Sequence, residues 1–440
     1  MTFEKFALDY SMKNIPISNE KEYKLQLLNK ARDFMRRMRI RAYFYEKFVN
    51  EETNNEPRKE TYGFKSNFNP TPSKNLLEFE KDLIALVKSV KFRRWTNKFQ
   101  EQMKKDAKDI NKTDKIIVKA DKTSNMYKLT IDEYNKLLLN NITKTYRKAD
   151  TEIVDKINKD AKDIAVELEL DDRINQLPAR EAYITLKDHK INFDRTPKCR
   201  LINPTKSEIG KISKIILENI NKNIRSKLML LQWTDPQQVV SWFDDLKDKK
   251  NLEFIKFDVR EFYPSITEEL LERSIKFAKR HHKITKQEIR IINNAAQSVL
   301  YHDDQVWIKR KDHGNPTFDI TMGGYHGAET CELVGLFILN EISKFVPKQN
   351  IGLYRDDGLM VIKKQSGQKT EKLKQKLHKF AHNIGLGLEI EGPMTRTDFL
   401  DIALDLEKQT YAPYRKENNE TKYIKTESNH PRTIINQIFQ

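Results

Sequence analysis

Cysteine is scarce in this sequence, and its scarcity disfavours small domains held together by disulfides or zinc. Cys199 and Cys331 are the only two cysteines among 440 residues, and neither lies in a Cys-x-x-Cys pair. Zinc ribbons and disulfide scaffolds need clustered cysteines. The cysteine content fits a reducing, intracellular compartment, and it does not distinguish nucleus from cytoplasm.

Long apolar runs are missing as well. No run approaches the roughly 18 apolar residues of a membrane-spanning helix, so no span is expected. The opening residues, MTFEKFALDYSMKN, lack the apolar core of a signal peptide. No G-x-x-x-x-G-K-[ST] loop occurs, which argues against a phosphate-loop nucleotide motor.

Acidic residues are in deficit. Lysine and arginine number 81 against 64 aspartates and glutamates, which gives a formal net charge of +17. Such an excess favours polyanionic partners, above all nucleic acids. The alternative is a soluble protein in which an AT-rich genome has accumulated lysine codons. The length allows two or three packed units.

The order of segments predicts an α+β protein rather than regular βαβ winding. Residues 1–110 read as helical and basic, and residues 31–49, ARDFMRRMRIRAYFYEKFV, interleave arginines with aromatic residues. Such a helix can face RNA or DNA, or it can simply have one packed and one solvated side. From residue 115 on, strand-like and helical segments are mixed, and residues 328–346 are expected to form a helix apolar on most sides.

Two segments predict neighbouring strands that end in acids. Residues 252–259, LEFIKFDV, alternate apolar and polar positions and end near Asp258. Residues 350–364, NIGLYRDDGLMVIKK, place Asp356 and Asp357 between two apolar runs, as at the tip of a hairpin. Ser265 with Glu268 predicts a capping box for one following helix, and a further helix is expected to start near Thr285.

Adjacent carboxylates at a hairpin tip repel each other and resist burial, and a divalent cation relieves both problems. Mg²⁺ binds one or two carboxylates and takes its other oxygens from phosphates and water. If the two strands are neighbours, Asp258 meets Asp356 at one sheet edge. Two ions about 3.5–4 Å apart there support an in-line phosphoryl transfer. Two other pairs, His281–His282 and Asp303–Asp304, are interpreted as surface features.

The acids belong to an ordered set of motifs that resembles reverse transcriptases. Residues 354–357, YRDD, resemble the YxDD box, residues 257–266, FDVREFYPSI, resemble the first catalytic motif, and residues 321–329, TMGGYHGAE, lie between them. The chain is more specifically similar to Penelope-like retroelements over about residues 115 to 435. The similar segments are VKADKTSNMYKLTIDEY, AYITLKDHK with PKCRLINP, DFLDIALDL and YRKENNETKYIKTESNHP.

The resemblance implies a right-hand polymerase with fingers, palm and partial thumb behind a helical basic N-terminal extension. The expected domains are 1–110 for the extension, 111–250 for the fingers, 251–405 for the palm and 406–440 for the start of the thumb. It implies an RNA-directed DNA polymerase that extends a DNA or RNA primer with dNTPs on an RNA template. The implied cofactor is Mg²⁺, as two ions, for which Mn²⁺ can substitute.

The resemblance also assigns the catalytic residues. Asp258, Asp356 and Asp357 would hold the metals, and the backbone carbonyl of Val259 would add a ligand. Tyr263, five positions after Asp258, occupies the steric-gate position, where a large ring excludes a 2′-hydroxyl and so favours deoxynucleotides. The alternative for Tyr263 is an ordinary core tyrosine.

Nucleotide contacts are expected from two further segments. Arg200 with Lys190 or Lys198 matches the basic pair that grips the triphosphate, since a guanidinium fork suits phosphate oxygens. Each lysine is otherwise a solvated surface charge. Gly323 and Gly324 would let the backbone approach template or nucleotide closely, or would simply form a turn.

Three residues are expected near the primer or template. Tyr354 precedes the two acids and is placed near the primer terminus. Phe399 and Leu400 lie in a segment that either supports the primer end or serves packing alone.

The sequence departs from the family pattern in three places. The glutamine common in the middle motif is absent, and the lysine often found after the hairpin has no clear counterpart. Many Penelope-like proteins carry a C-terminal endonuclease, and the residues that follow SNHP up to Gln440 are too few to form one. An RNA-dependent RNA polymerase, an inactive nucleic-acid-binding protein and a terminal or protein-primed transferase therefore stay open.

Overall fold

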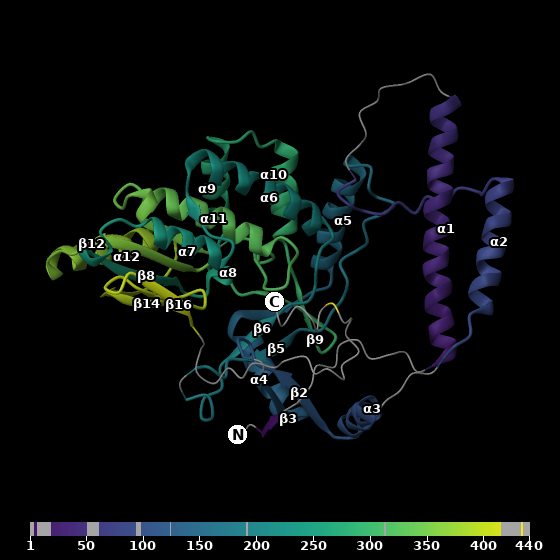
Figure 1. Ribbon diagram of the computed structural model, residues 1–440, viewed down its shortest axis with the longest axis horizontal. Helices are drawn as coiled ribbons and strands as arrows, with labels where there is room; N and C mark the ends of the chain where they lie inside the picture. The colour runs from purple at the N-terminus through teal and green to yellow at the C-terminus, as the bar shows by residue number, and fades with distance from the viewer. Residues whose placement is uncertain are drawn as a thin grey trace. The chain divides into compact units, whose positions relative to one another are not determined.

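The chain forms two compact units. The computed structural model describes residues 4–6, 19–50, 61–93, 98–123, 125–190, 192–311, 314–414 and 433 (Figure 1). The first unit comprises Met1–Lys119, Ser124–Tyr134 and Glu420–Gln440, and the second comprises Ala120–Thr123 and Asn135–Asn419. The predicted domain boundaries remain predictions, and residues 415–431, which carry the last of the resembling segments, lie outside the described residues.

In the first unit, the described residues form three complete helices and a small antiparallel sheet. The helices are α1 (Glu20–Asn50), α2 (Lys74–Ser89) and α3 (Lys98–Asn111), and the sheet has the order β1 (Glu4–Phe6), β3 (Met126–Thr130), β2 (Lys115–Lys119). The Arg39 guanidinium of α1 pairs with Glu80 of α2, whose side chain is buried. Arg36 donates a hydrogen bond to the carbonyl of Ser66. Two of the arginines in residues 31–49 therefore have partners within the unit.

The second unit contains most of the regular structure. Its helices are α4 (Ile131–Thr145, whose first turn belongs to the first unit), α5 (Glu152–Glu167), α6 (Ile209–Leu228), α7 (Pro236–Asp245), α8 (Phe262–Ser265), α9 (Glu268–Lys279), α10 (Lys286–Ala295), α11 (Gly327–Ile342) and α12 (Gly367–Asn383), with the 3-10 turns η1 (Lys249–Asn251) and η2 (Lys348–Asn350). Its strands are β4 (Tyr146–Ala149), β5 (Tyr183–Leu186), β6 (Cys199–Ile202), β7 (Leu231–Gln232), β8 (Leu252–Val259), β9 (Leu300–His302), β10 (Gln305–Lys309), β11 (Ile351–Tyr354), β12 (Asp357–Lys363), β13 (Leu388–Met394), β14 (Arg396–Phe399), β15 (Ile402–Asp405) and β16 (Thr410–Pro413).

A five-stranded sheet forms the centre of this unit, in the order β13-β8-β12-β11-β7. Strand β8 pairs antiparallel with both β12 and β13, and β7 pairs parallel with β11. The alternation predicted for residues 252–259 is confirmed, since Phe257 and Val259 are buried while Lys256 and Asp258 are half-buried. The hairpin predicted for residues 350–364 is also confirmed, as β11 and β12.

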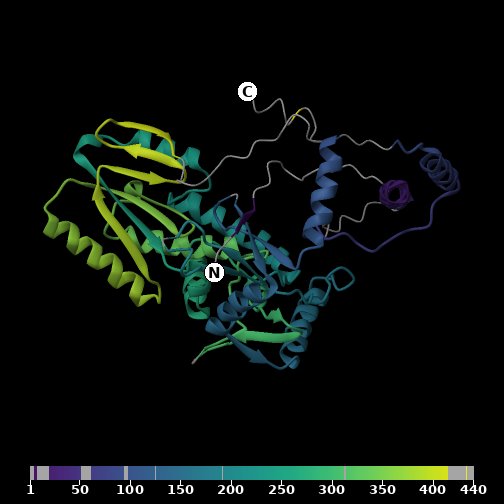
Figure 2. The ribbon, with the colours of Figure 1, turned by 90° about the horizontal axis from the view of Figure 1, so that it is seen from below.

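The two faces of the five-stranded sheet are covered by different elements. Phe254 of β8 and Val361 of β12 are register partners, so they share a face. They pack in one core with Trp242 of α7 and Leu404 of β15. The three-stranded sheet β14-β15-β16 lies over this face (yellow in Figures 1 and 2), and α12 lies on the opposite side.

Helix α11 is buried, as its apolar sequence predicts. It packs against α6 and α9 and against the β7–β11 edge of the sheet. A Cβ at Gly335 would stand 3.0 Å from both Gln232 Nε2 and Leu353 Cδ2, so α11 approaches that edge closely. This position sets the start of α11 beside the turn that follows β8, because α11 also contacts α8.

One predicted helix cap is confirmed and the other is wrong. Thr285 and Glu288 form a capping box at the start of α10. Helix α9 is instead capped by Thr267, whose side chain accepts a hydrogen bond from the Leu270 amide. Ser265 cannot cap α9 because it ends α8, where its amide donates to the Glu261 carbonyl.

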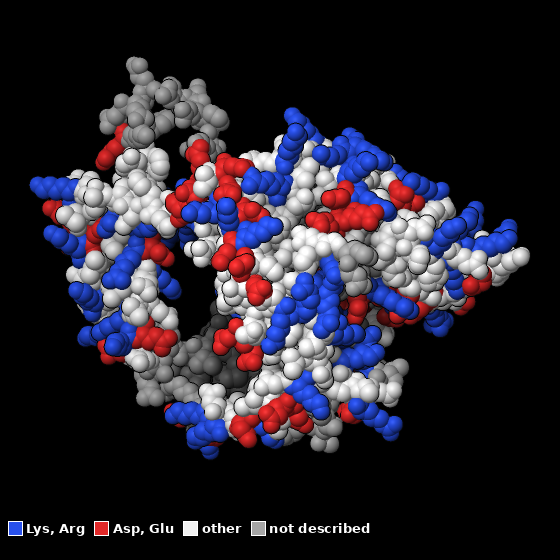
Figure 3. Space-filling model, turned by 180° about the vertical axis from the view of Figure 1, so that it is seen from behind, with Lys and Arg blue, Asp and Glu red and all other residues white. Residues whose placement is uncertain are grey.

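The surface is highly charged, and none of the described helices is long and apolar enough to cross a membrane. Lysine and arginine side chains are spread over the face in Figure 3, where smaller groups of acidic side chains interrupt them. On this face the basic side chains are thus spread widely rather than gathered in one patch.

Gly358 tests the packing beneath the hairpin. A Cβ at position 358 would overlap the ring of Phe257 on the neighbouring strand. We expect Gly358→Ala to lower the free energy of unfolding by about 1–3 kcal/mol, the usual cost of overpacking a core. Urea unfolding measures this decrease in the free energy of unfolding. The control is Gly367→Ala, because a Cβ there meets nothing within 4 Å. Equal stability of the two variants would contradict the packing.

Candidate active site

The three predicted acids meet at one end of the β8–β12 pair. Asp258 and Asp357 are direct register partners on neighbouring strands. Tyr354 pairs with Asp357 across the hairpin, so Arg355 and Asp356 form its two-residue turn. The turn is tied to β8, because the Val259 amide donates to the Asp356 carbonyl at 3.0 Å.

The turn itself has a strained backbone at Arg355. Arg355 has a φ of 54°, which lies in the left-handed region that residues other than glycine seldom occupy. Its guanidinium lies 5.5 Å from the centroid of the Tyr354 ring. Such a backbone conformation persists only where the surrounding structure holds it in place.

The carboxylates perturb each other electrostatically. Burial, followed by the charges of Asp357, Asp356 and Glu389, raises the pKa of Asp258 to about 6. Burial and then Asp356 raise the pKa of Asp357. As register partners on neighbouring strands, the two carboxyls therefore disfavour each other's ionised form.

The donor set suits a hard divalent cation. A bound cation would relieve the repulsion between these neighbouring carboxylates. Carboxylate oxygens are the ligands that Mg²⁺ and Mn²⁺ prefer, with remaining positions filled by phosphate and water. Within the described residues, no three His, Cys, Asp or Glu side chains are already arranged as a closed metal-binding group.

A fourth acid, Glu389, lies next to Asp258, and it was not predicted from the sequence. Glu389 of β13 is the register partner of Asp258 on the side away from β12. Its carboxylate accepts a hydrogen bond from Arg260 Nε at 2.8 Å. The alternation in LEIEG could have indicated it, because it puts Glu389 and Glu391 on one face.

The predicted steric-gate residue lies directly beyond β8. Tyr263 is in the short helix α8 and is half-buried. Burial raises its pKa, Cys331 and Asp356 act in the same direction, and Arg355 acts against them. The hydroxyl is therefore neutral, and the ring lies near the hairpin acids.

Arg200 is held by an acid that the sequence analysis did not single out. Its guanidinium lies 3.1 Å from Asp121 Oδ1, and the Asp121 side chain is 7% exposed. Lys190 and Lys198 are both exposed, in or next to the β5–β6 connection. Their predicted contact with a triphosphate stays a prediction.

Two lysines close to these groups were also missed. Burial and then the charge of Arg200 lower the pKa of Lys187, which also interacts with Glu261. Lys122 lowers the pKa of both Asp258 and Asp357, so it lies within electrostatic reach of the acids. Both stand inside quoted motifs, VKADK and ITLKDHK, which were the available signal.

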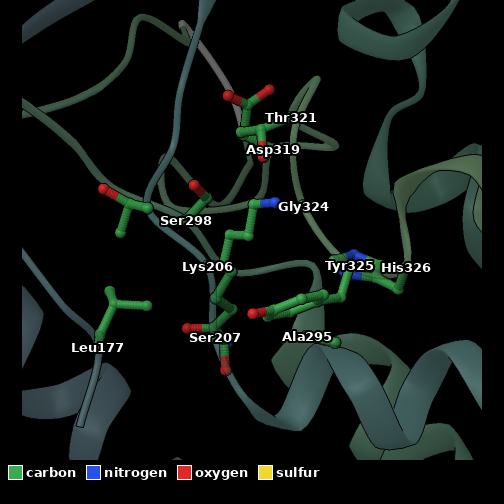
Figure 4. A pocket seen from close by; sticks show the side chains of 12 residues that line it. Leu177, Lys206, Ser207, Ala295, Ser298, Asp319, Thr321, Gly324, Tyr325 and His326 are labelled. Carbon is green, nitrogen blue, oxygen red and sulfur yellow. The ribbon is translucent and has the colours of Figure 1, made fainter. Parts of the chain in front are cut away.

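Gly323 and Gly324 lie in the loop before α11. Gly323 has a φ of 117°, and a Cβ there would stand 2.8 Å from the Asn203 carbonyl. Gly324 helps to line a small polar pocket beside Tyr325 and His326 (Figure 4). Burial lowers the pKa of His326 to about 4, so this imidazole is neutral.

An ion pair between Lys309 and Asp319 anchors the loop before α11. Lys309 Nζ of β10 lies 3.0 Å from Asp319 Oδ1 and donates to the Pro264 carbonyl at 2.7 Å. The Tyr146 hydroxyl of β4 donates to Asp319 Oδ2 at 2.6 Å. The turn that carries Tyr263 and the loop before α11 are therefore tied through one lysine.

The three residues predicted near the primer lie at different depths. Tyr354 is half-buried and packs against the core under the sheet. Phe399 is 2% exposed and its ring centroid lies 5.4 Å from that of Trp233. Leu400 is half-buried in a turn with a φ of 49°. Their role toward a primer stays a prediction.

Comparisons with known proteins bear on the fold. No protein-family model and no curated protein matches the sequence. Telomerase from Candida albicans in complex with a TWJ fragment of telomeric RNA is similar over 82% of this chain and 59% of its own, with a TM-score of 0.51 and 11% identity. Apo telomerase from Candida tropicalis is similar over 77% of this chain and 59% of its own, with a TM-score of 0.48 and 13% identity.

This chain thus spans 59% of the length of either telomerase. The RNA-dependent RNA polymerase of BmCPV at elongation state is similar over 64% of this chain and 27% of its own, with a TM-score of 0.37 and 9% identity. The similarity to the Candida albicans structure confirms the predicted fold. The chain has an α+β right-hand polymerase fold with a helical N-terminal extension.

Proposed function

We propose that this chain is an RNA-directed DNA polymerase that extends a primer 3′-hydroxyl with dNTPs. One observation carries the proposal. Asp258 lies opposite Asp357 on neighbouring strands, with Asp356 in the adjoining turn, so three carboxylates gather at one end of the β8–β12 pair. A fold shared with a telomerase is consistent with this chemistry.

Each residue has a distinct part in the proposed reaction. Asp258, Asp356 and Asp357 would hold two Mg²⁺ or Mn²⁺ ions, with a carbonyl ligand from Val259. Such ions supply activation of a hydroxyl and neutralisation of phosphate charge when bound. In the proposed reaction, the primer 3′-hydroxyl loses its proton and attacks the α-phosphate of the dNTP. The new phosphodiester bond forms as the bond to the leaving pyrophosphate breaks.

Cationic side chains bind the triphosphate in this proposal. Arg200, kept in place by Asp121, presents a fork of donors that matches phosphate oxygens. Lys187 or one of the predicted pair Lys190 and Lys198 would add a second cation. Tyr263 would sit under the sugar and exclude a 2′-hydroxyl.

The finer assignment is a retroelement-derived enzyme of the Penelope-like type. It rests on the order of the motifs in the sequence, from VKADK through YRDD to DFLDIALDL. The proposed partners are an RNA template and a DNA or RNA primer, and the net charge of +17 suits both.

The acidic site should destabilise the metal-free fold. We expect Asp258→Asn to raise the free energy of unfolding at pH 7 by an amount on the order of 1 kcal/mol, after allowance for solvent screening, because it removes like-charge repulsion. Since the wild-type pKa is about 6, the gain shrinks as the pH falls below that value and the wild-type carboxyl takes up its proton. Urea unfolding at pH 7 and pH 5 measures both.

Magnesium adds a second readout for the same variant. Millimolar Mg²⁺ should raise the Tm of the wild type and leave Asp258→Asn unchanged, since only the native acids bind the ion. Asp304→Asn is the matched control, because Asp303–Asp304 is an exposed acidic pair in another turn. Equal Mg²⁺ shifts in all three proteins would contradict a metal site at Asp258.

Primer extension tests the reaction itself. Asp356→Ala should reduce extension by at least about a thousandfold, because it removes a metal ligand, and should leave primer–template binding intact. The assay compares RNA with DNA templates, dNTPs with NTPs, and reactions with and without template. Preference for NTPs would indicate an RNA polymerase, and extension without template would indicate a terminal transferase. No extension by the wild type would reject the proposal.

The cation that accompanies Arg200 can be identified by kinetics. Lys187→Ala should raise the KM for dNTP about tenfold with a smaller change in kcat, because a charge-assisted contact to phosphate is lost. Lys190→Ala and Lys198→Ala, measured in the same assay, show which lysine contributes. An unchanged KM in Lys187→Ala would exclude it from the triphosphate site.

A further inference from the structure

One ammonium group bonds to two segments that meet beside Tyr263. Lys309 Nζ donates to the Pro264 carbonyl at 2.7 Å and lies 3.0 Å from Asp319 Oδ1. Pro264 follows Tyr263 directly in α8, and Asp319 lies in the loop before α11. The lysine therefore holds α8 and this loop together, although the two segments are far apart in the sequence.

The ring of Tyr263 reaches from α8 to the start of α11. A Cβ at Gly327, the first residue of α11, would stand 3.3 Å from Tyr263 Cε1 and 3.0 Å from the Thr321 carbonyl. One edge of the ring therefore lies against bare helix backbone, which the loop after Asp319 contacts at Thr321. The space for the ring thus depends on how firmly Pro264 and Asp319 are held together.

Lys309 is itself held by a regular element. It ends β10, where its register partner on β4 is Tyr146, so the two side chains share a face. The Tyr146 hydroxyl donates to Asp319 Oδ2 at 2.6 Å, which fixes the carboxylate from a second side. The side chains of Lys309 and Asp319 are 11% and 3% exposed. Hydrogen bonds in such a buried place are stronger than in water, so the link is firm.

We propose that Lys309 is a positioning residue that fixes α8 against the loop before α11 and thereby sets the strength of sugar selection by Tyr263. The inference rests on the proposed polymerase function. A steric gate discriminates only if its ring cannot move aside when a 2′-hydroxyl arrives. The alternative is an ion pair that serves the fold alone, and such a pair can be replaced by neutral residues with little effect.

The first test measures sugar discrimination, the ratio of kcat/KM for dNTP to that for NTP on one primer–template. Lys309→Met alone would leave the Asp319 carboxylate buried and unpaired, so the variant is the neutral pair Lys309→Met/Asp319→Asn. It loses the bond to Pro264 and should lower the ratio about three- to tenfold. Asp319→Asn alone keeps the lysine as a donor to Pro264 and should stay within about twofold of the wild type.

A matched control separates positioning from general packing. Lys311 is half-buried, two residues further along, and donates to the Phe318 carbonyl at 3.0 Å, within its own loop. Lys311→Met should therefore leave the ratio unchanged, and a loss equal to that of the double variant would overturn the inference. A double variant with the wild-type ratio, while Tyr263→Ala lowers it, would also overturn the inference and keep the gate.

Folding of the double variant is checked by urea unfolding before the kinetics. If it does not fold, Lys309→Gln/Asp319→Asn takes its place, because the glutamine side chain is neutral and shorter than that of lysine. The same three- to tenfold loss of discrimination, in round numbers about one hydrogen bond, is expected from it. A wild-type ratio in this variant would overturn the inference in the same way.

A second test needs no activity. The Ser265 amide donates to the Glu261 carbonyl at 3.0 Å and the Ile266 amide to the Tyr263 carbonyl at 3.3 Å, so their hydrogen exchange reports the opening of α8. Both amides should exchange about three- to tenfold faster in the neutral double variant and at the wild-type rate in Lys311→Met. Unchanged exchange in the double variant would overturn the inference. If the wild type extends no primer yet the exchange is faster, the proposed function fails while the anchoring of α8 by Lys309 stands.

Discussion

The register between β8 and β12 is the constraint on which the site depends. In an antiparallel pair, direct partners point to the same face, so placing Asp258 opposite Asp357 commits two carboxylates to one small volume. A slip of one residue would turn Asp258 to the opposite face. The register is secured along the whole strand, because Phe254 and Val361 are buried in the same core beneath it.

This placement is electrostatically unfavourable by itself, and neighbouring groups only partly compensate for it. The raised pKa values of Asp258 and Asp357 record the repulsion. Lys122 and Lys256 act in the other direction on Asp357, and Lys256 is itself anchored on the Asp398 carbonyl at 3.0 Å. The repulsion at this end of the β8–β12 pair thus lowers the free energy of unfolding below what the well-packed core alone would give. Such a cost is expected where function and stability compete.

The acids were predictable because their signals are local. The alternation in LEFIKFDV fixed the face of Asp258, and two apolar runs fixed the hairpin around Asp356 and Asp357. The capping error at Ser265 has a different cause. Two candidate caps stand two residues apart, and only the tertiary structure reveals that Ser265 still belongs to α8.

The missed residues act through contacts between distant segments. Lys187 in a polar turn has the sequence appearance of any solvated lysine, yet it lies beside Arg200 and is partly buried. Glu389 reads as an ordinary solvated acid, and only the pairing of β13 with β8 brings it beside Asp258. Periodicity predicts which face of an element is buried, but it does not predict which residue of another segment packs against that face.

The strand β4 carries a consequence for the growing chain on the ribosome. It pairs only with β10 among the described strands, and its Tyr146 hydroxyl bonds to Asp319. Both partners lie more than a hundred residues later in the sequence, so they are translated long after β4. Until then β4 has two open edges of unpaired amides and carbonyls, a state that invites association with other chains and that chaperones commonly guard. Completion of this layer must therefore await synthesis of β10 and of the loop before α11.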